Sequence, residues 1–159
     1  MIIMYKMQKN IPDLFDVFSG QKMKGFISDC YDGDSCKAIV TIPKTDIQVR
    51  ITCRMDGYDS PELRTYDANE KRFGIEARDF LREIILKKNV LLTCRGGDKY
   101  GRILTTIETE DGKNINQYML DNNLGHPYSG GTKNKVTYND DNTFIREGIT
   151  YMVSASKEL

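Results

Sequence analysis

Asp46-Ile-Gln-Val-Arg-Ile-Thr-Cys-Arg-Met55 is the clearest strand pattern in the sequence, because its apolar and polar residues alternate from end to end. The odd-numbered residues from Ile47 to Met55 are apolar, and those between them are polar or charged. A period of two places these sets on opposite faces of a β-strand, one buried and one in water. Arg54 is therefore predicted to lie on the solvent-exposed face, near the end of its strand.

Four further segments have a β-strand pattern. Phe26–Tyr31 and Ser35–Ile42 come before this strand, and the dipeptide Asp32-Gly33 between them is typical of a hairpin turn. Asn89–Arg95 and Tyr100–Thr109 come after it. The sequence therefore predicts three antiparallel strands, a separate segment, and then two more strands.

Helical patterns occupy the rest of the chain. Gly74–Lys88 has one apolar stripe with charged residues elsewhere, which predicts a helix. The polar segment Glu62–Phe73 before it is predicted to be a loop. A short helix is predicted at Ile115–Asn123, and a last helical stretch at Phe144–Val153, with the loop Ser129–Asn142 between them.

Three antiparallel strands, a helix and two more strands is the order of a five-stranded Greek-key barrel of the OB type. Other α+β folds share this count of elements, so the pattern alone leaves them open. We predict an α+β fold with a five-stranded OB-type Greek-key β-barrel and about three helices. A length of 159 residues fits one domain, which we place at residues 23–159. Residues 1–22 are predicted to be an N-terminal extension. Three of its apolar residues could pack on the barrel: Phe15, Val17 and Phe18.

Composition narrows the classes of protein. Basic and acidic residues number 23 each, so the formal net charge is zero. This argues against binding nucleic acid through a diffuse positive surface, but not against an enzyme whose positive charge is local. No apolar run approaches the roughly 20 residues that cross a bilayer, and the N-terminal residues do not resemble a secretory signal. We expect an intracellular, monomeric protein without a membrane partner, and a viral or mobile-element origin fits this expectation.

The cysteines do not indicate a zinc site. None of the four has CxxC spacing to another: Cys30, Cys36, Cys53 and Cys94. In an intracellular protein they are predicted to be reduced thiols buried in strands, with a disulfide as the alternative. The single histidine, His126, sits beside Pro127 with no evident partner.

Polar motifs stand at the ends of three predicted strands. They are Asp32-Gly33-Asp34, Arg54 with Asp59-Ser60-Pro61-Glu62, and Asp98-Lys99-Tyr100-Gly101-Arg102. Each also fits an ordinary turn or helix start. A turn, however, does not require the second acid at Asp34, and it does not explain two arginines aimed at the same end of the sheet.

Together these residue types suit phosphodiester cleavage. That reaction needs a hard cation to neutralise phosphate charge, a base for the attacking water, and fixed donors for the charge that develops at phosphorus. Carboxylate and carbonyl oxygens suit Ca²⁺, and arginine suits a pair of phosphoryl oxygens. A glutamate near the metal can deprotonate water. The sequence has no cysteine–histidine pair or Ser-His-Asp set that would indicate another chemistry.

The motifs resemble those of the thermonuclease family, the staphylococcal-nuclease-like OB-fold nucleases. Asp32-Gly-Asp-Ser35 resembles the family's DGDT-type turn, and Arg54-Met-Asp-Gly-Tyr-Asp-Ser-Pro-Glu62 resembles its R-x4-D-T-P-E motif. Gly74-Ile-Glu-Ala77 resembles the opening of its helix, and Asp98-Lys-Tyr-Gly-Arg102 its DKYGR motif. The four motifs agree with the family in order and approximate spacing, over about residues 24–128.

The resemblance implies an endonuclease that uses one Ca²⁺ ion to hydrolyse DNA and RNA with low sequence specificity. Water attacks phosphorus in line in that family, and the products end in a 3′-phosphate. Asp34, Asp59 and the backbone carbonyl of Ser60 are the implied Ca²⁺ ligands, and Asp32 has a supporting role. Glu62 resembles the general base.

The resemblance also implies residues that bind the substrate. Arg54 and Arg102 resemble the residues that bind the phosphate and the transition state. Lys99 and Tyr100 resemble those that hold a terminal phosphate of a nucleotide. Tyr128 is the one counterpart found for the pair of tyrosines that stack on the nucleotide.

Some positions depart from the family pattern. Ser60 replaces the usual threonine but keeps the carbonyl, and residues 129–142 look unlike the usual linker into the last helix. The alternative function is a non-catalytic OB-fold module that binds nucleic acid. Such modules usually lack one or more of the acids or arginines, and here all are present. A purely structural Ca²⁺-binding module would leave Arg54 and Arg102 unexplained.

Overall fold

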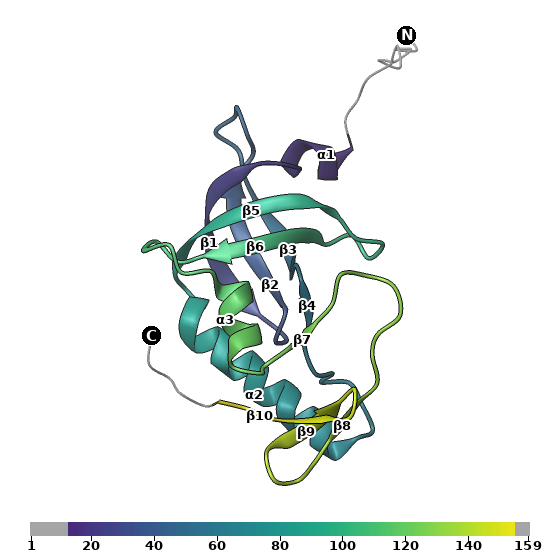
Figure 1. Ribbon diagram of the computed structural model, residues 1–159. Coiled ribbons are helices and arrows are strands. Elements are labelled where there is room, and N and C mark those ends of the chain that lie inside the picture. The colour runs from purple at the N-terminus through teal and green to yellow at the C-terminus, as the bar shows by residue number, and fades with distance from the viewer. Residues whose placement is uncertain (1–12, 155–159) are drawn as a thin grey trace.

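Five strands form a closed barrel in a computed structural model that describes residues 13–154 (Figure 1). The strands follow one another around the barrel as β1-β2-β3-β6-β5, and β3 and β6 are the one parallel pair among them. Their bounds are Lys22–Cys30 for β1, Ser35–Thr41 for β2, Gln48–Met55 for β3, Asn89–Gly97 for β5 and Ile103–Glu108 for β6. With the helices α1 (Leu14–Phe18), α2 (Ala68–Ile85) and α3 (Ile115–Asp121), this confirms the predicted α+β barrel of the OB type.

The first helix, α1, packs against strand β5 of the barrel. Phe18 of α1 is fully buried, and Phe15 and Val17 pack against the core, as predicted. The backbone continues into the sheet, where the N–H of Gly20 donates to the carbonyl of Cys94 at 2.8 Å. Gly97 of β5 lies directly under the Phe15 ring, and a β-carbon at Gly97 would collide with that ring. Residues 1–12 of the predicted extension lie outside the described residues.

The helix α2 begins at Ala68, so the predicted loop over residues 62–73 is wrong in its second half. The cause is the side chain of Asp67, which accepts hydrogen bonds from the N–H groups of Asn69 and Glu70 and caps the helix. The first turns are polar because they face water, and the buried stripe starts at Phe73.

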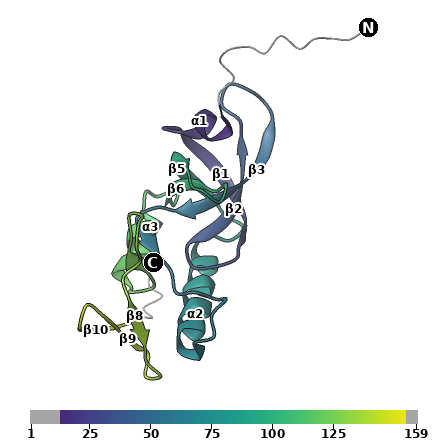
Figure 2. The same cartoon turned by 90° about the vertical axis from the view of Figure 1, so that its right-hand side faces the viewer.

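The predicted last helix is also wrong, because the chain forms a three-stranded antiparallel sheet there. Its strands are β8 (Val136–Tyr138), β9 (Thr143–Arg146) and β10 (Ile149–Met152). Glu147 and Gly148 both have positive φ, 52° and 77°, which is the conformation of a tight two-residue hairpin turn. The turn places Phe144 opposite Tyr151, and their rings stack at 5.2 Å. This small sheet and α2 lie side by side below the barrel (Figure 2).

The barrel strands also hold the four cysteines. Cys30, Cys36, Cys53 and Cys94 are all buried as free thiols, in β1, β2, β3 and β5. Burial raises the pKa of both Cys30 and Cys94 to about 12, so neither forms a reactive thiolate at neutral pH. Within residues 13–154, no helix is both long and apolar enough to span a bilayer.

Candidate active site

The first two motifs meet where the turn between β1 and β2 lies against the end of β3. The hydroxyl of Tyr58 donates to the carbonyl of Gly33 at 2.8 Å, and the N–H of Met55 donates to the carbonyl of Asp34 at 2.7 Å. A β-carbon at Gly33 would lie 2.7 Å from the β-carbon of Ala77 in α2 and 2.8 Å from that of Ser60. Glycine is therefore required at this turn, since α2 packs directly on it.

Arg54 is buried, with 7% of its surface exposed, so its predicted place on the solvent-exposed face is wrong. The chain folds back after Gly57 into the short strand β4 (Tyr58–Asp59), which pairs with β7 (His126–Pro127) and covers this end of β3. One terminal nitrogen of Arg54, Nη1, donates to the carbonyls of Met55 and Tyr58, both at 2.8 Å. The alternation correctly places Ile51, Cys53 and Met55 on the buried face, but Ile47 lies before β3 and is 59% exposed. The alternation also does not predict which segment covers the polar face.

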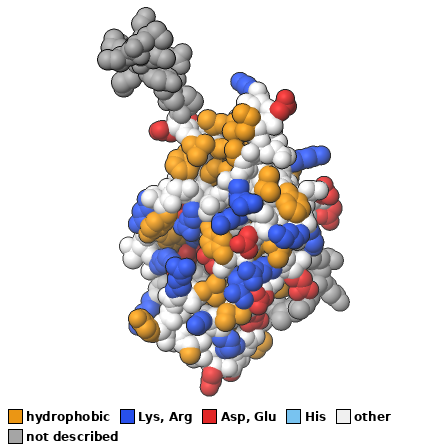
Figure 3. Space-filling model, turned by 180° about the vertical axis from the view of Figure 1, so that it is seen from behind, with side chains coloured by type: hydrophobic (Ala, Val, Ile, Leu, Met, Phe, Trp, Pro, Cys, Tyr) orange, Lys and Arg blue, Asp and Glu red, His pale blue; other side chains and the backbone are white. Residues whose placement is uncertain are grey.

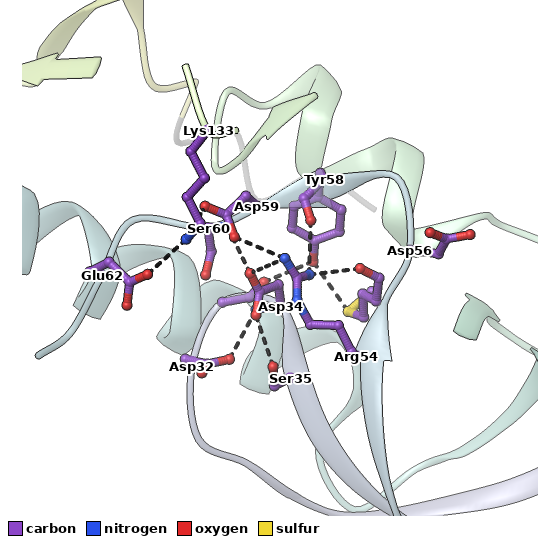
Figure 4. A network of polar contacts seen from close by, with 12 residues as sticks. Asp32, Asp34, Ser35, Arg54, Asp56, Tyr58, Asp59, Ser60, Glu62 and Lys133 are labelled. Carbon is purple, nitrogen blue, oxygen red and sulfur yellow. Dashed lines mark hydrogen bonds and ion pairs between the residues drawn. The ribbon is translucent and has the colours of Figure 1, made fainter. Parts of the chain in front are cut away.

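The guanidinium of Arg54 joins two carboxylates (Figure 4). Its Nη2 lies 2.9 Å from Oδ1 of Asp59 and 3.2 Å from Oδ2 of Asp34. Asp34 is 5% exposed, and it also accepts from the N–H of Ser60 at 2.8 Å and from the hydroxyl of Ser35 at 2.9 Å. Two motifs that are 20 or more residues apart in sequence are therefore held together by one buried arginine.

Negative charge is in excess at this point. Burial, followed by the negative charge of Asp34, raises the pKa of Asp32 to about 7. Burial also raises the pKa of Asp59, an effect that Lys133 and Arg54 oppose and that Asp34 adds to. The ionised forms of carboxylates that are close together and partly buried are stabilised by a cation bound among them.

Glu62 lies at the edge of the group with 56% of its side chain exposed. Lys133, which the sequence analysis did not single out, reaches it from the loop after β7. The ammonium Nζ lies 2.9 Å from Oε1 of Glu62 and 2.7 Å from Oδ2 of Asp59. In Figure 4 the Lys133 side chain points down between the two carboxylates.

Arg102 joins the same site from the other side. Asp98 holds it through Nε at 2.7 Å and through the backbone N–H at 3.0 Å. Its Nη1 donates to the hydroxyl of Ser35 at 3.2 Å, and that hydroxyl donates to Asp34. The third motif is therefore connected to the first through the hydroxyl of Ser35.

The three remaining predicted residues lie near the surface. Tyr100 is 71% exposed, and its ring lies between the Lys99 ammonium at 5.1 Å and the Arg102 guanidinium at 5.4 Å. The hydroxyl of Tyr128 donates to the carbonyl of Gly131 at 2.9 Å. Tyr128 lines a cavity of about 170 Å³ together with Asp59, Glu62 and other residues.

Known proteins resemble this chain in sequence. A sequence profile described as "Staphylococcal nuclease homologue" matches residues 52–145, which is more than half of the chain. The chain belongs to the staphylococcal nuclease homologue family. The match begins inside β3, so the family range contains Arg54, Glu62 and Arg102, while Asp34 lies before it.

Several relatives of this family member are named as endonucleases. A protein of Escherichia coli named "Uncharacterized endonuclease" is 29% identical over 118 residues, which cover 72% of this chain and 69% of the relative. "Endonuclease YhcR" of Bacillus subtilis (strain 168) is 29% identical over 115 residues, 66% of this chain but 9% of that protein. "Probable endonuclease LCL3" of Yarrowia lipolytica is 32% identical over 80 residues, 48% of this chain and 35% of that protein.

The carboxylates of this family member suit a hard cation. Within residues 13–154, no group of three or more histidine, cysteine, aspartate or glutamate side chains is close enough to hold a metal ion. Asp34 and Asp59 both contact Nη2 of Arg54, however, and the hydroxyl of Ser35 and the carboxylate of Asp32 are further oxygen donors next to Asp34. An all-oxygen donor set with an excess of negative charge fits Ca²⁺, which accepts water and carbonyl ligands beside a few carboxylates.

The single histidine is outside this chemistry. The expectation that His126 lacks a partner is wrong, since its Nε2 lies 2.7 Å from the hydroxyl of Tyr138. Its ring is buried and packs edge-on against Phe144 at 4.8 Å. Burial, followed by the positive charge of Arg146, lowers the pKa of His126 to about 4. The side chain therefore joins the small C-terminal sheet to the β4–β7 pair as a neutral group.

We expect the imidazole signals of His126 to titrate with a midpoint near pH 4 in the folded protein, well below the ordinary 6.5. Because the folded-state pKa is the lower one, the neutral ring favours folding above about pH 6.5, and this contribution is lost as the pH falls through 4. NMR can follow the ring without assignment, because the chain has one histidine. The same signals in urea are the control, and a folded-state midpoint near 6.5 would show that water reaches the ring.

Proposed function

We propose that the chain is a Ca²⁺-dependent endonuclease that hydrolyses DNA and RNA with low sequence specificity. The observation that supports this most strongly is the shared contact of Arg54 with Asp34 and Asp59, beside an exposed glutamate and a second arginine. The endonuclease names of the relatives support the same reaction class. Acidic and basic side chains are mixed over the face in Figure 3, which favours recognition by local charge.

Each residue has a proposed part in the reaction. Asp34, Asp59 and the carbonyl of Ser60 would hold Ca²⁺, with Asp32 in support, and the ion would supply positive charge to neutralise the phosphate. Glu62 accepts the proton of the attacking water as the new P–O bond forms in line with the P–O5′ bond that breaks. The 5′ oxygen takes up a proton from solvent and leaves as a hydroxyl, and the other fragment ends in a 3′-phosphate. Asp59, Ser60 and Glu62 line one cavity, which supports these proposed roles.

The arginines have different surroundings. Arg102 is oriented by Asp98 and presents a fixed guanidinium to the phosphate and to the charge that develops at phosphorus. Arg54 has a second part, since its contacts with two carbonyls and two carboxylates also keep the acids in place. Lys99, Tyr100 and Tyr128 contact the nucleotide around the site.

The experiment that tests this function is incubation of the purified protein with plasmid DNA and with single-stranded RNA, in CaCl₂ and in EDTA. We expect both nucleic acids to be cut in CaCl₂, and no cutting in EDTA. The products should accept a label at the 3′ end only after phosphatase treatment. Binding of single-stranded oligonucleotides without cleavage in CaCl₂ would instead favour a non-catalytic module.

A further inference from the structure

Lys133 lies between two acids that have separate parts in the proposed reaction. Its Nζ contacts Oδ2 of Asp59, a proposed metal ligand, at 2.7 Å, and Oε1 of Glu62, the proposed base, at 2.9 Å. An ammonium group has three donors and no acceptor, so one lysine can bridge both carboxylates. Burial of Asp59 makes this partner more important, since only 18% of that side chain is exposed.

The loop that carries Lys133 is fastened at both ends. We define it as residues 128–135, between β7 and β8. At its start, the N–H of Tyr128 donates to the carbonyl of Gly57 at 3.0 Å. Near its end, the side-chain amide of Asn134 donates to Glu147 at 2.9 Å. The position of the ammonium group is therefore set by the fold around it, and the loop residues between the two anchors are exposed.

A divalent cation and this ammonium group compete for the same oxygen atoms. Asp59 already directs Oδ1 to Arg54 and Oδ2 to Lys133. A metal ion bound at Asp59 would place two positive centres within a few ångström of each other, which is strongly unfavourable at a partly buried position. Glu62 is held by the same ammonium group, because its Oε1 accepts a hydrogen bond from Lys133 Nζ at 2.9 Å.

We propose that Lys133 is a built-in counter-cation, which holds Asp59 and Glu62 until a divalent metal ion displaces it. Binding of the metal then releases the loop 128–135 and frees Glu62 in a single exchange. This inference rests on the proposed function, since it takes Asp59 as a metal ligand. It makes Lys133 a positioning residue that lowers the affinity for metal and keeps the metal-free site together.

The test compares Lys133→Gln with the parent protein and with Lys135→Gln, which removes the same charge from an exposed position of the same loop. Isothermal titration of Ca²⁺ into each metal-free protein gives the dissociation constants. We expect Lys133→Gln to bind Ca²⁺ about tenfold more tightly, because two partly exposed ion pairs no longer oppose binding, each worth up to a few-fold. Lys135→Gln should bind like the parent, and Lys133→Arg should restore the parent affinity.

Amide hydrogen exchange supplies a second readout. In the parent, Ca²⁺ should speed the exchange of the Tyr128 N–H, which donates to the carbonyl of Gly57 at the start of the loop, whereas in Lys133→Gln this N–H should exchange fast with or without the ion. If Lys133→Gln binds Ca²⁺ no more tightly than the parent, the proposed displacement of Lys133 by the metal ion is wrong, while the metal dependence of the enzyme stands. If no variant binds Ca²⁺, both the displacement of Lys133 and the Ca²⁺ part of the proposed function are wrong.

Discussion

Replacing Glu62 by glutamine should lower the rate of DNA and RNA hydrolysis at least about a hundredfold at saturating Ca²⁺, since a positioned general base contributes about 10²–10⁴-fold. The folded state should hardly change. The Glu62 side chain is 56% exposed, and its ion pair is with Lys133, whose side chain is 50% exposed. Such a pair contributes roughly 0–1 kcal/mol to the free energy of unfolding. Single-turnover cleavage of a labelled oligonucleotide, together with urea denaturation, measures both effects.

Glu110→Gln is the control for this experiment. Glu110 is exposed on the turn after β6 and lines a different hollow from the one beside Glu62. Glu110→Gln also removes one carboxylate, but it should leave the rate of DNA and RNA hydrolysis unchanged. Equal rates for Glu62→Gln and the parent would remove Glu62 from the mechanism, whereas equal losses in both variants would indicate a general effect of charge on nucleic-acid binding.

Local patterns predicted the barrel because its strands are specified by nearest neighbours. The alternation in β3 and the Asp-Gly turn before β2 are properties of short segments, and both are found in the structure. The C-terminal sheet was not predicted, because the local spacing of its apolar residues also fits a helix. The apolar residues of Phe144–Val153 have helical spacing. Glu147 and Gly148, however, both have positive φ and form the turn of a hairpin between two strands.

The site was predictable in its motifs but not in its long-range contacts. Asp34, Arg54 and Arg102 stood out because a turn or strand does not require them. The burial of Arg54 depends on β4 and its partner β7, which lie far apart in the sequence. Lys133 contacts Glu62 across 71 positions, within a loop that has no distinctive pattern. Such contacts depend on the packing of distant segments, and one sequence carries no local signal for them.

Arg54→Met should both abolish detectable cleavage and lower the free energy of unfolding by about 3–5 kcal/mol, the usual cost of removing one partner from a buried ion pair. The variant leaves Asp34 and Asp59 facing each other with 5% and about a fifth of their surfaces in water, and without the guanidinium between them. Two backbone carbonyls also lose their donor. Urea denaturation of the metal-free protein measures the change.

Arg95→Met is the matched control, because Arg95 makes a two-bond ion pair with Asp56 at 2.6 and 2.8 Å, but with 64% of its side chain in water. Its loss should cost at most about 1 kcal/mol. The pH dependence of the free energy of unfolding should also distinguish the two variants. Burial already raises the pKa of Asp59, and Arg54 is one of the groups that oppose this rise. Without Arg54, the pKa of Asp59 in the folded state rises further, so folding of the variant takes up protons. The loss of free energy of unfolding in Arg54→Met therefore becomes smaller as the pH falls below 7. A deficit that is the same at pH 7 and pH 5 would show that the lost backbone contacts, and not the uncompensated acids, account for the instability.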